Sequence, residues 1–262
     1  MDLGLSKQVV VVTGAAAGIG EATARLLVDE GAIVVGVDRA EGTMGTLGGR
    51  LTPILADLTD PGTPGRVAEH AMAVHGRIDG LVNNAGSVNL RTGFLDTTDA
   101  DWDATFALNF HAARRMARAV LPAMVAAGSG SLVHVTSESA RLPDGHESDY
   151  ATSKIALLGL SKALAVEFGP RGVRSNVVAP GPTRTAMWET PGGFGETIAS
   201  FLGGVSLDEA ATRLVTELRP LLTRRIGLPE DVARVIAYLV SPAARQVTAS
   251  EWAVDGGALR QV

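Results

Sequence analysis

The sequence contains no cysteine, and aromatic residues make up only 4% of its 262 residues. Without cysteine the chain can form no disulfide, no thiolate nucleophile and no sulfur-ligated metal site, which agrees with a reducing compartment. No apolar run reaches the roughly 18 residues of a membrane-spanning helix. Residues 1–7 also lack the basic start and apolar core of a signal peptide. These absences predict a soluble, cytoplasmic protein.

The net charge and the composition argue against several classes of binding partner. The net charge of −5 offers no basic surface for nucleic acid or an anionic membrane, so we expect neither as a partner. The five histidines show no spacing typical of metal ligands, and we expect no metal. Hydrophobic residues make up 46% of the chain, as in compact globular proteins. Because we find no linker or internal repeat, residues 1–262 are expected to form a single domain.

Short apolar runs alternate along the chain with longer segments of helical periodicity. Strands that are apolar without alternation are buried on both faces, and the helices between them supply the covering layers. The pattern predicts a doubly wound α/β fold with a seven-stranded parallel sheet and helices on both faces. The expected strands are 9–12, 33–37, 51–55, 78–82, 132–135, 173–178 and 252–254. The expected helices are 21–30, 66–75, 101–126, 150–168 and 231–239.

The segment 185–226 interrupts this alternation. It is rich in glycine and carries Pro191, and a connection of that length in a compact domain is usually a lid or a disordered segment. We expect a substrate lid, although the same residues could instead anchor a pair of surface helices. The apolar side chains on which either interpretation depends are Met187, Trp188, Phe194, Phe201 and Leu202.

A glycine-rich loop, T-G-A-A-A-G-I-G, follows the first expected strand directly and opens the first helix. Gly14, Gly18 and Gly20 would allow a tight turn, close approach of the backbone to a pyrophosphate, and tight packing of helix on strand. The N–H groups at the helix start would then face the phosphates. The motif on its own is equally compatible with a structural turn. No Gly-Lys-Ser/Thr follows, which excludes a Walker-type nucleotide site.

Asp38 ends the second expected strand and strengthens the dinucleotide interpretation. An acidic side chain about 20 residues after the loop can accept hydrogen bonds from both hydroxyls of an adenosine ribose. It would repel a 2′-phosphate, and residues 15–17 are all alanine and offer no basic partner. These residues favour NAD over NADP, with the neighbouring Arg39 as the one residue that could still accept NADP.

Tyr150 and Lys154 form a second local pattern, because the chain has only two tyrosines and only three of its 23 basic residues are lysine. Four residues apart on a helix, they lie on the same face. A free phenol has a pKa near ~10, and a nearby positive charge favours its phenolate. Tyr150 is therefore the candidate acid and base that exchanges a proton with a ketone or alcohol oxygen.

Taken together, the motifs resemble the short-chain dehydrogenase/reductase family over essentially the whole chain. The residues that carry the resemblance, in chain order, are the glycine loop, Asp57-Leu58, Asn83 to Gly86, Asn109, Ser137, Tyr150 with Lys154, Asn176, and Pro180-Gly181 through Thr185. One departure is Val247-Thr248-Ala249, where the family often has glycine in the third place. The resemblance implies a Rossmann-like fold, a nicotinamide cofactor and a homotetramer built from the long fourth and fifth helices and the C-terminal segment.

The resemblance also implies roles for individual residues. Ser137 would orient the substrate oxygen, Asn109 would hold a water that passes protons to Lys154, and Lys154 would also bind the nicotinamide ribose. The cofactor would be bound by Gly14, Ala17, Gly18, Ile19, Gly20, Asp38, Arg39, Asp57, Leu58, Asn84, Ala85, Gly86, Tyr150, Lys154, Pro180, Gly181, Thr183 and Thr185. Asp57 and Leu58 would meet the adenine, and Asn84 to Gly86 would line the adenosine ribose side. The nicotinamide carboxamide would be held by Pro180, Gly181, Thr183 and Thr185.

The expected activity is hydride transfer between NAD(H) and a secondary alcohol or ketone. The alternatives are an NADPH-dependent 3-oxoacyl-type reductase and a dinucleotide-binding protein without catalysis. For substrate contacts we expect Ser139, Met187 and Trp188, with His146 either at the pocket rim or in an exposed loop. An aromatic lid suggests a medium-sized substrate that is apolar or cyclic.

Overall fold

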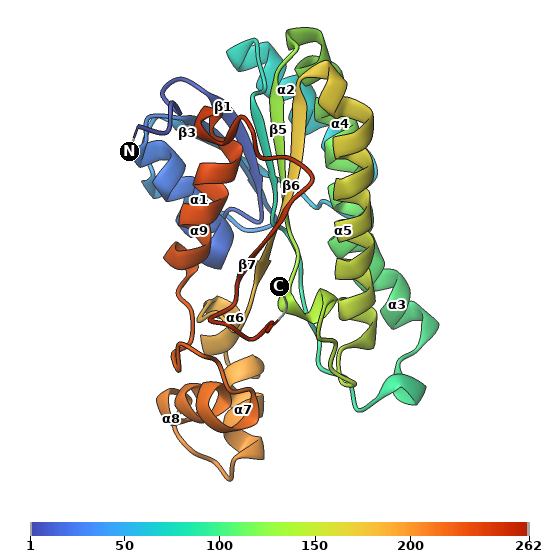
Figure 1. Cartoon of the computed structure of the whole chain (residues 1–262), viewed down its shortest axis with the longest axis vertical. Helices are drawn as coiled ribbons and strands as arrows, with labels where there is room; N and C mark the ends of the chain where they lie inside the picture. The colour runs from blue at the N-terminus through green and yellow to red at the C-terminus, as the bar shows by residue number, and fades with distance from the viewer. Residues whose placement is uncertain (1, 261–262) are drawn as a thin grey trace.

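Seven parallel strands form one sheet at the centre of the molecule (Figure 1). The computed structural model describes residues 2–260. The strands are β1 (Val9–Thr13), β2 (Ile33–Asp38), β3 (Leu51–Leu55), β4 (Gly80–Asn83), β5 (Gly130–Val135), β6 (Val173–Pro180) and β7 (Glu251–Val254). Their spatial order is β3-β2-β1-β4-β5-β6-β7, and the predicted seven-stranded Rossmann-like sheet is confirmed.

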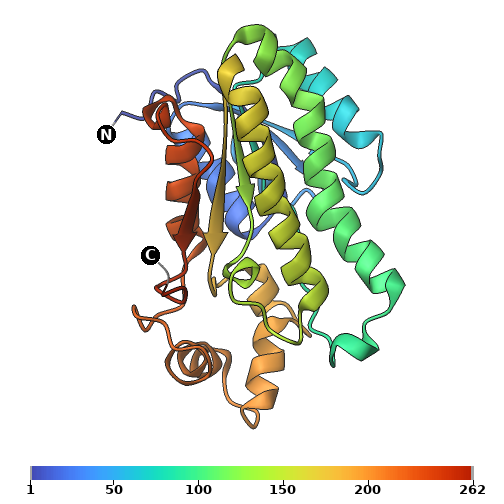
Figure 2. The ribbon, with the colours of Figure 1, turned by 45° about the vertical axis from the view of Figure 1, so that its right-hand side comes forward.

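Helices cover both faces of the sheet (Figure 2). On one face α1 (Gly18–Asp29) and α9 (Pro229–Val240) pack Leu27 and Ile236 against the sheet. On the other face lie α2 (Thr63–His75), α4 (Ala113–Ala127) and α5 (Ser148–Phe168). The inner strands are buried along their whole length, β1 and β5 completely, because side chains on both of their faces meet a helical layer.

The strand order reverses between β1 and β4, and this reversal determines where a ligand can bind. Val10 of β1 is paired with Val34 on one side and with Gly80 of β4 on the other. The chain runs from β1 to β2 in one direction and later from β4 to β5 in the other, so the connections leave opposite faces. In open α/β sheets the crevice at such a point, beyond the carboxyl ends of the strands, is where ligands bind.

The expected helix 101–126 is wrong as a single regular helix. The structure has α3 (Asp99–Phe106), a π-helical turn η3 (Ala107–Ala112) and then α4. The start lies earlier than expected because Thr98 forms a capping box with Asp101, in which each residue's side chain satisfies the other's backbone N–H. A π turn inserts an extra residue into the helix, and such turns are frequent at functional sites.

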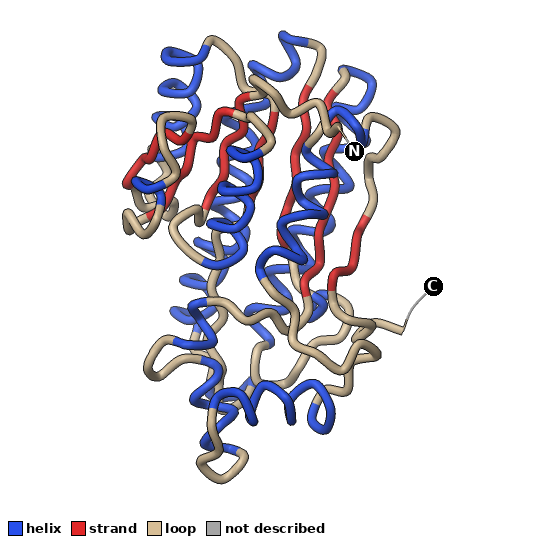
Figure 3. Tube along the Cα trace, turned by 90° about the vertical axis from the view of Figure 1, so that its left-hand side faces the viewer, coloured by secondary structure: helices blue, strands red, loops and turns tan. Residues whose placement is uncertain are grey.

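The insertion 185–226 is helical and contributes a small hydrophobic cluster of its own. It contains α6 (Ala186–Glu189), α7 (Phe194–Phe201), α8 (Leu207–Arg213) and a second π-helical turn, η6 (Leu214–Leu218). Trp188, Ala210 and Val215 lie at the centre of the cluster. Figure 3 shows these helices grouped beyond the ends of the strands, outside the layers that cover the sheet.

The remaining helical elements are short 3₁₀ turns that connect the main elements. They are η1 (Met44–Thr46), η2 (Phe94–Asp96), η4 (Glu138–Ala140), η5 (Gly169–Arg171) and η7 (Pro242–Ala244). Within residues 2–260, every helix is too short or too polar to cross a membrane.

Candidate active site

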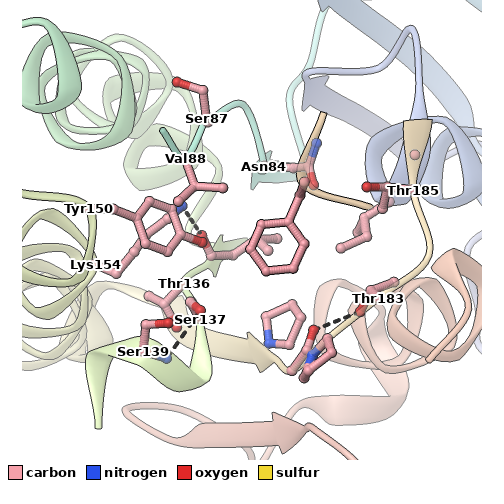
Figure 4. A pocket seen from close by; sticks show the side chains of 18 of the residues that line it. Asn84, Ser87, Val88, Thr136, Ser137, Ser139, Tyr150, Lys154, Thr183 and Thr185 are labelled. Atoms are coloured by element: carbon pink, nitrogen blue, oxygen red, sulfur yellow. Dashed lines mark hydrogen bonds between the residues drawn. The ribbon is translucent and has the colours of Figure 1, made fainter. Parts of the chain in front are cut away.

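A cavity of about 400 Å³ opens at the carboxyl ends of the strands and extends from the glycine loop to the insertion. In Figure 4, Tyr150, Lys154, Ser137 and Ser139 lie on one side of this cavity, Thr183 and Thr185 on the other, and Asn84 between them. The predicted site residues that line it are Gly14, Ala17, Gly18, Ile19, Asp38, Asn84, Ala85, Gly86, Ser137, Ser139, Tyr150, Lys154, Pro180, Gly181, Thr183, Thr185 and Trp188.

The glycine loop has the backbone geometry that glycine alone adopts easily. Gly14 and Gly18 have φ angles of +67° and +58°, in the left-handed region. A Cβ at position 20 would overlap the Gly14 carbonyl oxygen, so this helix turn packs directly on the loop. The N-cap of α1 is Ala17, whose methyl group can accept no hydrogen bond. The first N–H groups of α1 are therefore left to bind an anion in the cavity.

Asn84 and Thr13 hold the loop at the end of β1. The Asn84 side-chain amide donates hydrogen bonds to the carbonyl oxygens of Thr13 at 3.0 Å and Gly14 at 3.2 Å. In return, the backbone N–H groups of Asn84 and Ala85 donate to the Thr13 hydroxyl. The end of β4 is thus fixed to the end of β1, so Asn84 supports the loop in addition to lining the cavity.

Asp38 lies at the end of β2 and is held by backbone donors. Its Oδ2 accepts from the N–H of Ala16 at 3.1 Å, and its Oδ1 accepts from the N–H groups of Arg39 and Ala40. These bonds orient a carboxylate beside the glycine loop, on the wall of the cavity. The Arg39 side chain is exposed and does not line the cavity.

Tyr150 lies in the first turns of α5, and a buried charge network anchors that end of the helix. The neighbouring Asp149 is 1% exposed and accepts hydrogen bonds from Arg91 and Thr105. Lys154, one turn further on, is 3% exposed, and its ammonium donates to the Val135 carbonyl oxygen at the end of β5. The Lys154 nitrogen lies 5.5 Å from the centre of the Tyr150 ring.

The environment of Tyr150 disfavours its phenolate, contrary to the expected effect of the lysine. Burial raises the pKa of Tyr150 to about 12; the Ser137 hydroxyl opposes this shift, and the charges of Glu147 and Glu138 add to it. Burial also lowers the pKa of Lys154 to about 8. The spacing of Tyr150 and Lys154 reveals the neighbouring cation but not the desolvation of both groups, which depends on the folded structure.

Ser137 and Asn109 occupy different positions relative to the cavity. Ser137 follows β5 and lines the cavity; its hydroxyl oxygen accepts from the backbone N–H of Ser139 at 3.1 Å, which orients it. Asn109 lies in the η3 turn behind the cavity wall, with its side chain bonded to both backbone groups of Ser87. A Cβ at Gly86 would lie 3.0 Å from Asn109 Oδ1 and 3.2 Å from the Lys154 nitrogen. The water-holding role of Asn109 stays a prediction.

Some predicted residues do not reach this cavity. His146 is exposed, with its ring bonded to the Arg91 carbonyl oxygen, so of the two alternatives the structure gives the exposed loop residue. Asp57 is exposed and accepts from Thr59, while Leu58 is buried in the core beneath α2 and α4. Their predicted contacts with adenine are not tested. Met187 falls within α6, but its side chain lies outside the described part of the structure.

Three charged residues of the cavity wall were not predicted from the sequence. Glu138, Glu147 and Arg219 all line it, and the Arg219 Nε lies 3.0 Å from Oε1 of Glu138. Glu138 and Glu147 are 3% and 8% exposed, and burial raises the pKa of both carboxyls, that of Glu138 to about 7. Only the positions of Glu138 and Glu147, between Ser137 and Tyr150, could have drawn attention to them in the sequence.

The aromatic residues of the insertion divide between the cavity and the surface. Trp188 and Phe194 line the cavity, with their ring centres 5.6 Å apart. Phe201 is 76% exposed and contributes nothing to the cavity wall. The insertion therefore supplies two aromatic side chains to the cavity wall.

Comparison with known proteins places this site in a family. Residues 14–258 match the family model described as enoyl-(acyl carrier protein) reductase. The chain is 35% identical to dehydrogenase/reductase SDR family member 4 of Homo sapiens over 260 residues, covering 97% of this chain and 88% of the relative. It is 33% identical to the 3-oxoacyl-[acyl-carrier-protein] reductase FabG of Thermotoga maritima, with coverage of 97% and 98%.

A solved structure shows the same similarity in three dimensions. The L-sorbose reductase of Gluconobacter frateurii, solved in complex with NADPH and L-sorbose, superposes with a TM-score of 0.91 and 32% identity over 100% of both chains. Fold and sequence similarity both extend over nearly the whole length, and they agree with the motifs that first indicated the resemblance. The chain belongs to the short-chain dehydrogenase/reductase family of oxidoreductases.

Proposed function

We propose that the protein is an NAD(H)-dependent oxidoreductase that interconverts a secondary alcohol and the corresponding ketone on a medium-sized cyclic compound. One observation carries the proposal: Ser137, Tyr150 and Lys154 line the same cavity as the glycine loop. An acid and base, a donor for the substrate oxygen and a phosphate-binding helix end therefore face one space. A dinucleotide-binding protein without catalysis would not need the first two.

The cavity fits a nicotinamide dinucleotide. The uncapped start of α1 and the glycines beside it suit the pyrophosphate, and Asp38 suits the ribose hydroxyls. Gly181 and Thr183, at the end of β6, offer backbone groups and a hydroxyl for the nicotinamide end. When bound, the nicotinamide ring supplies or accepts the hydride.

Ser137 and Tyr150 bind the substrate oxygen and transfer the proton. Ser137 donates a hydrogen bond to that oxygen, a contribution whose loss typically costs about 10²- to 10³-fold in rate. Tyr150 gives its proton to the forming alcohol, or accepts one in the reverse direction. Because its pKa is raised to about 12, Tyr150 is protonated at neutral pH and ready to donate. The rate of ketone reduction is therefore favoured near pH 7, and the rate of alcohol oxidation increases as the pH rises.

Asp38 is the basis for choosing NAD over NADP. Its carboxylate stands where a 2′-phosphate would be repelled, and three backbone N–H groups hold it there. The second candidate is an NADPH-dependent reductase of 3-oxoacyl type, favoured by the similarity to the Thermotoga maritima reductase and by the exposed Arg39 next to Asp38. Dissociation constants for NADH and NADPH separate the two candidates.

The proposed enzyme is cytoplasmic and a homotetramer, as the family resemblance implies. An apolar groove between α4 and α5, lined by Leu121, Val125, Leu160 and Leu164, supports pairing of these helices between subunits. Light scattering coupled to size-exclusion chromatography measures the assembly directly. A monomeric mass at micromolar concentration would contradict it.

Replacing Tyr150 with phenylalanine tests the catalytic part of the proposal. The variant should lose turnover while its dissociation constant for NADH stays within about twofold of the wild type, because the phenol proton is needed for chemistry alone. Tyr238→Phe is the matched control, since Tyr238 lies on α9, does not line the cavity and packs on Trp252 of β7. Wild-type turnover in the Tyr150 variant would overturn the assignment.

A further inference from the structure

The end of the cavity formed by Ser137, Tyr150 and the insertion contains buried hydrogen-bonding groups that have no partner. Among residues 2–260, Oε2 of Glu138 and Oε1 of Glu147 are buried and accept no hydrogen bond. Both side chains are more than nine-tenths buried, and both residues line the cavity. Buried polar atoms are almost always paired in folded proteins, so each of these oxygens calls for an explanation.

The two carboxyls lie close to the reacting centre. The charges of Glu147 and Glu138 both raise the pKa of Tyr150, and that of Glu147 raises the pKa of Glu138. Arg219 pairs with Glu138 at 3.0 Å and donates to the Leu142 carbonyl oxygen. A cluster of acceptors and donors therefore surrounds the place where a substrate held by Ser137 and Tyr150 would extend.

We infer that Glu138 and Glu147 bind the hydroxyl groups of a polyhydroxylated substrate, of the sugar, sugar alcohol or cyclitol class, next to the carbon that is oxidised or reduced. This inference rests on the proposed function and specifies the substrate of the same site. A carboxyl group has two oxygens and can accept from two neighbouring hydroxyls at once. Trp188 and Phe194, whose rings are inclined at 52° to each other, add aromatic surface against which the apolar face of a ring can pack.

The charges of the cluster argue against other substrate classes. Burial raises the pKa of both carboxyls, and Arg219, 3.0 Å from Glu138, offsets part of their negative charge. A cationic substrate would gain little from such a wall, and an anionic one would meet two carboxyls. An apolar substrate would leave the buried oxygens unpaired, which sites built for hydroxyl groups reject strongly.

The test compares kcat/KM for cyclohexanol with that for a panel of hexoses, hexitols and cyclitols, each with NAD and with NADP. The best polyhydroxylated compound should exceed cyclohexanol by at least about a hundredfold, as expected for sites that hydrogen-bond a substrate hydroxyl. Glu138→Gln and Glu147→Gln should each lower that value by about tenfold or more and change the cyclohexanol value by a clearly smaller factor, which reports their effect on Tyr150 alone. Glu69→Gln, on the exposed side of α2, is the control and should change neither.

The outcomes separate this inference from the proposed function. If wild type prefers cyclohexanol, or if the two variants lower both values equally, Glu138 and Glu147 do not select the substrate. NADH binding without turnover of any polyhydroxylated compound also overturns the inference and leaves the cofactor assignment standing. Loss of both NADH binding and turnover overturns the proposed function, and the inference with it. If Glu138→Gln fails to fold, Glu147→Gln carries the comparison, because in the described structure Glu147 forms no salt bridge.

Discussion

Glu138 and Arg219 form an ion pair with 3.0 Å between Oε1 and Nε, and this contact joins the segment after β5 to the end of the insertion. The Glu138 side chain is 4% exposed and that of Arg219 is 25% exposed. A carboxyl buried to this degree binds protons more readily than it does in water, even beside a guanidinium. The pair therefore links the ionisation of the cavity wall to the stability of the fold.

Glu138 and His134 should contribute with opposite sign to the pH dependence of the free energy of unfolding. The pKa of the buried His134 is lowered to about 4, so this residue makes the protein more stable as the pH rises from about 4 to its ordinary 6.5. The pKa of Glu138 is raised to about 7, so it makes the protein less stable as the pH rises from its ordinary 4.5 to 7. In wild type the two effects partly cancel.

Glu138→Gln should remove one of these opposing effects. Between pH 4.5 and 6.5 its free energy of unfolding should rise with pH more steeply than that of wild type, by at most about 1.4 kcal/mol per pH unit for one proton. Denaturant unfolding at several pH values measures the slope, with Glu69→Gln as the control. Parallel curves for wild type and Glu138→Gln would show that the carboxyl titrates normally.

Gly20→Ala should damage both stability and cofactor binding. A Cβ there would overlap the Gly14 carbonyl oxygen and lie 2.5 Å from the Asn84 amide, so the loop must move. We expect a loss of at least about 2 kcal/mol in the free energy of unfolding and a much weaker NADH complex. The control is Gly65→Ala in α2, where a Cβ meets nothing within 4 Å.

The control substitution Gly65→Ala should itself change the free energy of unfolding. Alanine in place of Gly65 restricts the unfolded chain and should raise stability by about 0.5–1 kcal/mol. Thermal and denaturant unfolding measure both variants. Similar effects of the two substitutions would mean that the glycine loop is not packed as described.

Asp38→Asn should shift cofactor preference towards NADP. The substitution removes the charge that repels a 2′-phosphate, while the amide oxygen can still accept from the backbone N–H groups of Arg39 and Ala40. The ratio of the NADH and NADPH dissociation constants should change by about tenfold or more, which corresponds to ~1.4 kcal/mol. If Arg39→Ala reverses the gain in the double variant, Arg39 binds the phosphate; an unchanged ratio in Asp38→Asn would place the ribose elsewhere.

Lys154→Arg should inactivate the enzyme although it keeps the positive charge. The Lys154 nitrogen donates to Val135 in a space where even a Cβ on Gly86 would come within 3.2 Å. A planar guanidinium is larger and cannot lose its charge as a buried lysine can. We expect kcat to fall at least about a hundredfold, in the range reported for a lost positioning group. Lys162→Arg, at an exposed position on α5, should retain wild-type activity.

The sheet could be predicted from the sequence because its cause is local. Each strand is a short apolar run; inner strands such as β1 and β5 are buried on both faces, whereas the edge strands β3 and β7 are only partly buried. The observed strand ends lie within two residues of the predicted ones. Helix starts were less accurate: α2 begins at Thr63 and not at residue 66. The π turn around Asn109 could not be recognised from the spacing of apolar residues, because the apolar pattern continues on either side of the one extra residue.

From local spacing alone, the candidate site could be predicted only where its residues form a pattern along the chain, whereas Ser137 was predicted from the family resemblance. The glycine loop and the Tyr150-Lys154 pair carry their geometry in their spacing along a loop and a helix. The partner of Glu138 could not be predicted, since Arg219 is far away in sequence, within an insertion that has no clear period. The burial of Glu147 likewise depends on long-range packing, so the polar wall becomes visible only in three dimensions.

The insertion enters and leaves the domain through a narrow neck. Thr183 and Gly227 form a parallel β-bridge, with Arg184 donating to Gly227 and Gly227 to Pro182, just before residue 185 and just after residue 226. Since this bridge already holds the two ends together, the length of the chain between them costs little in closure entropy. The insertion therefore has its own apolar cluster and ends that are held together independently of its length. Residues 185–226 should be replaceable by the corresponding segment of a relative, which would alter the substrate range without changes to the sheet.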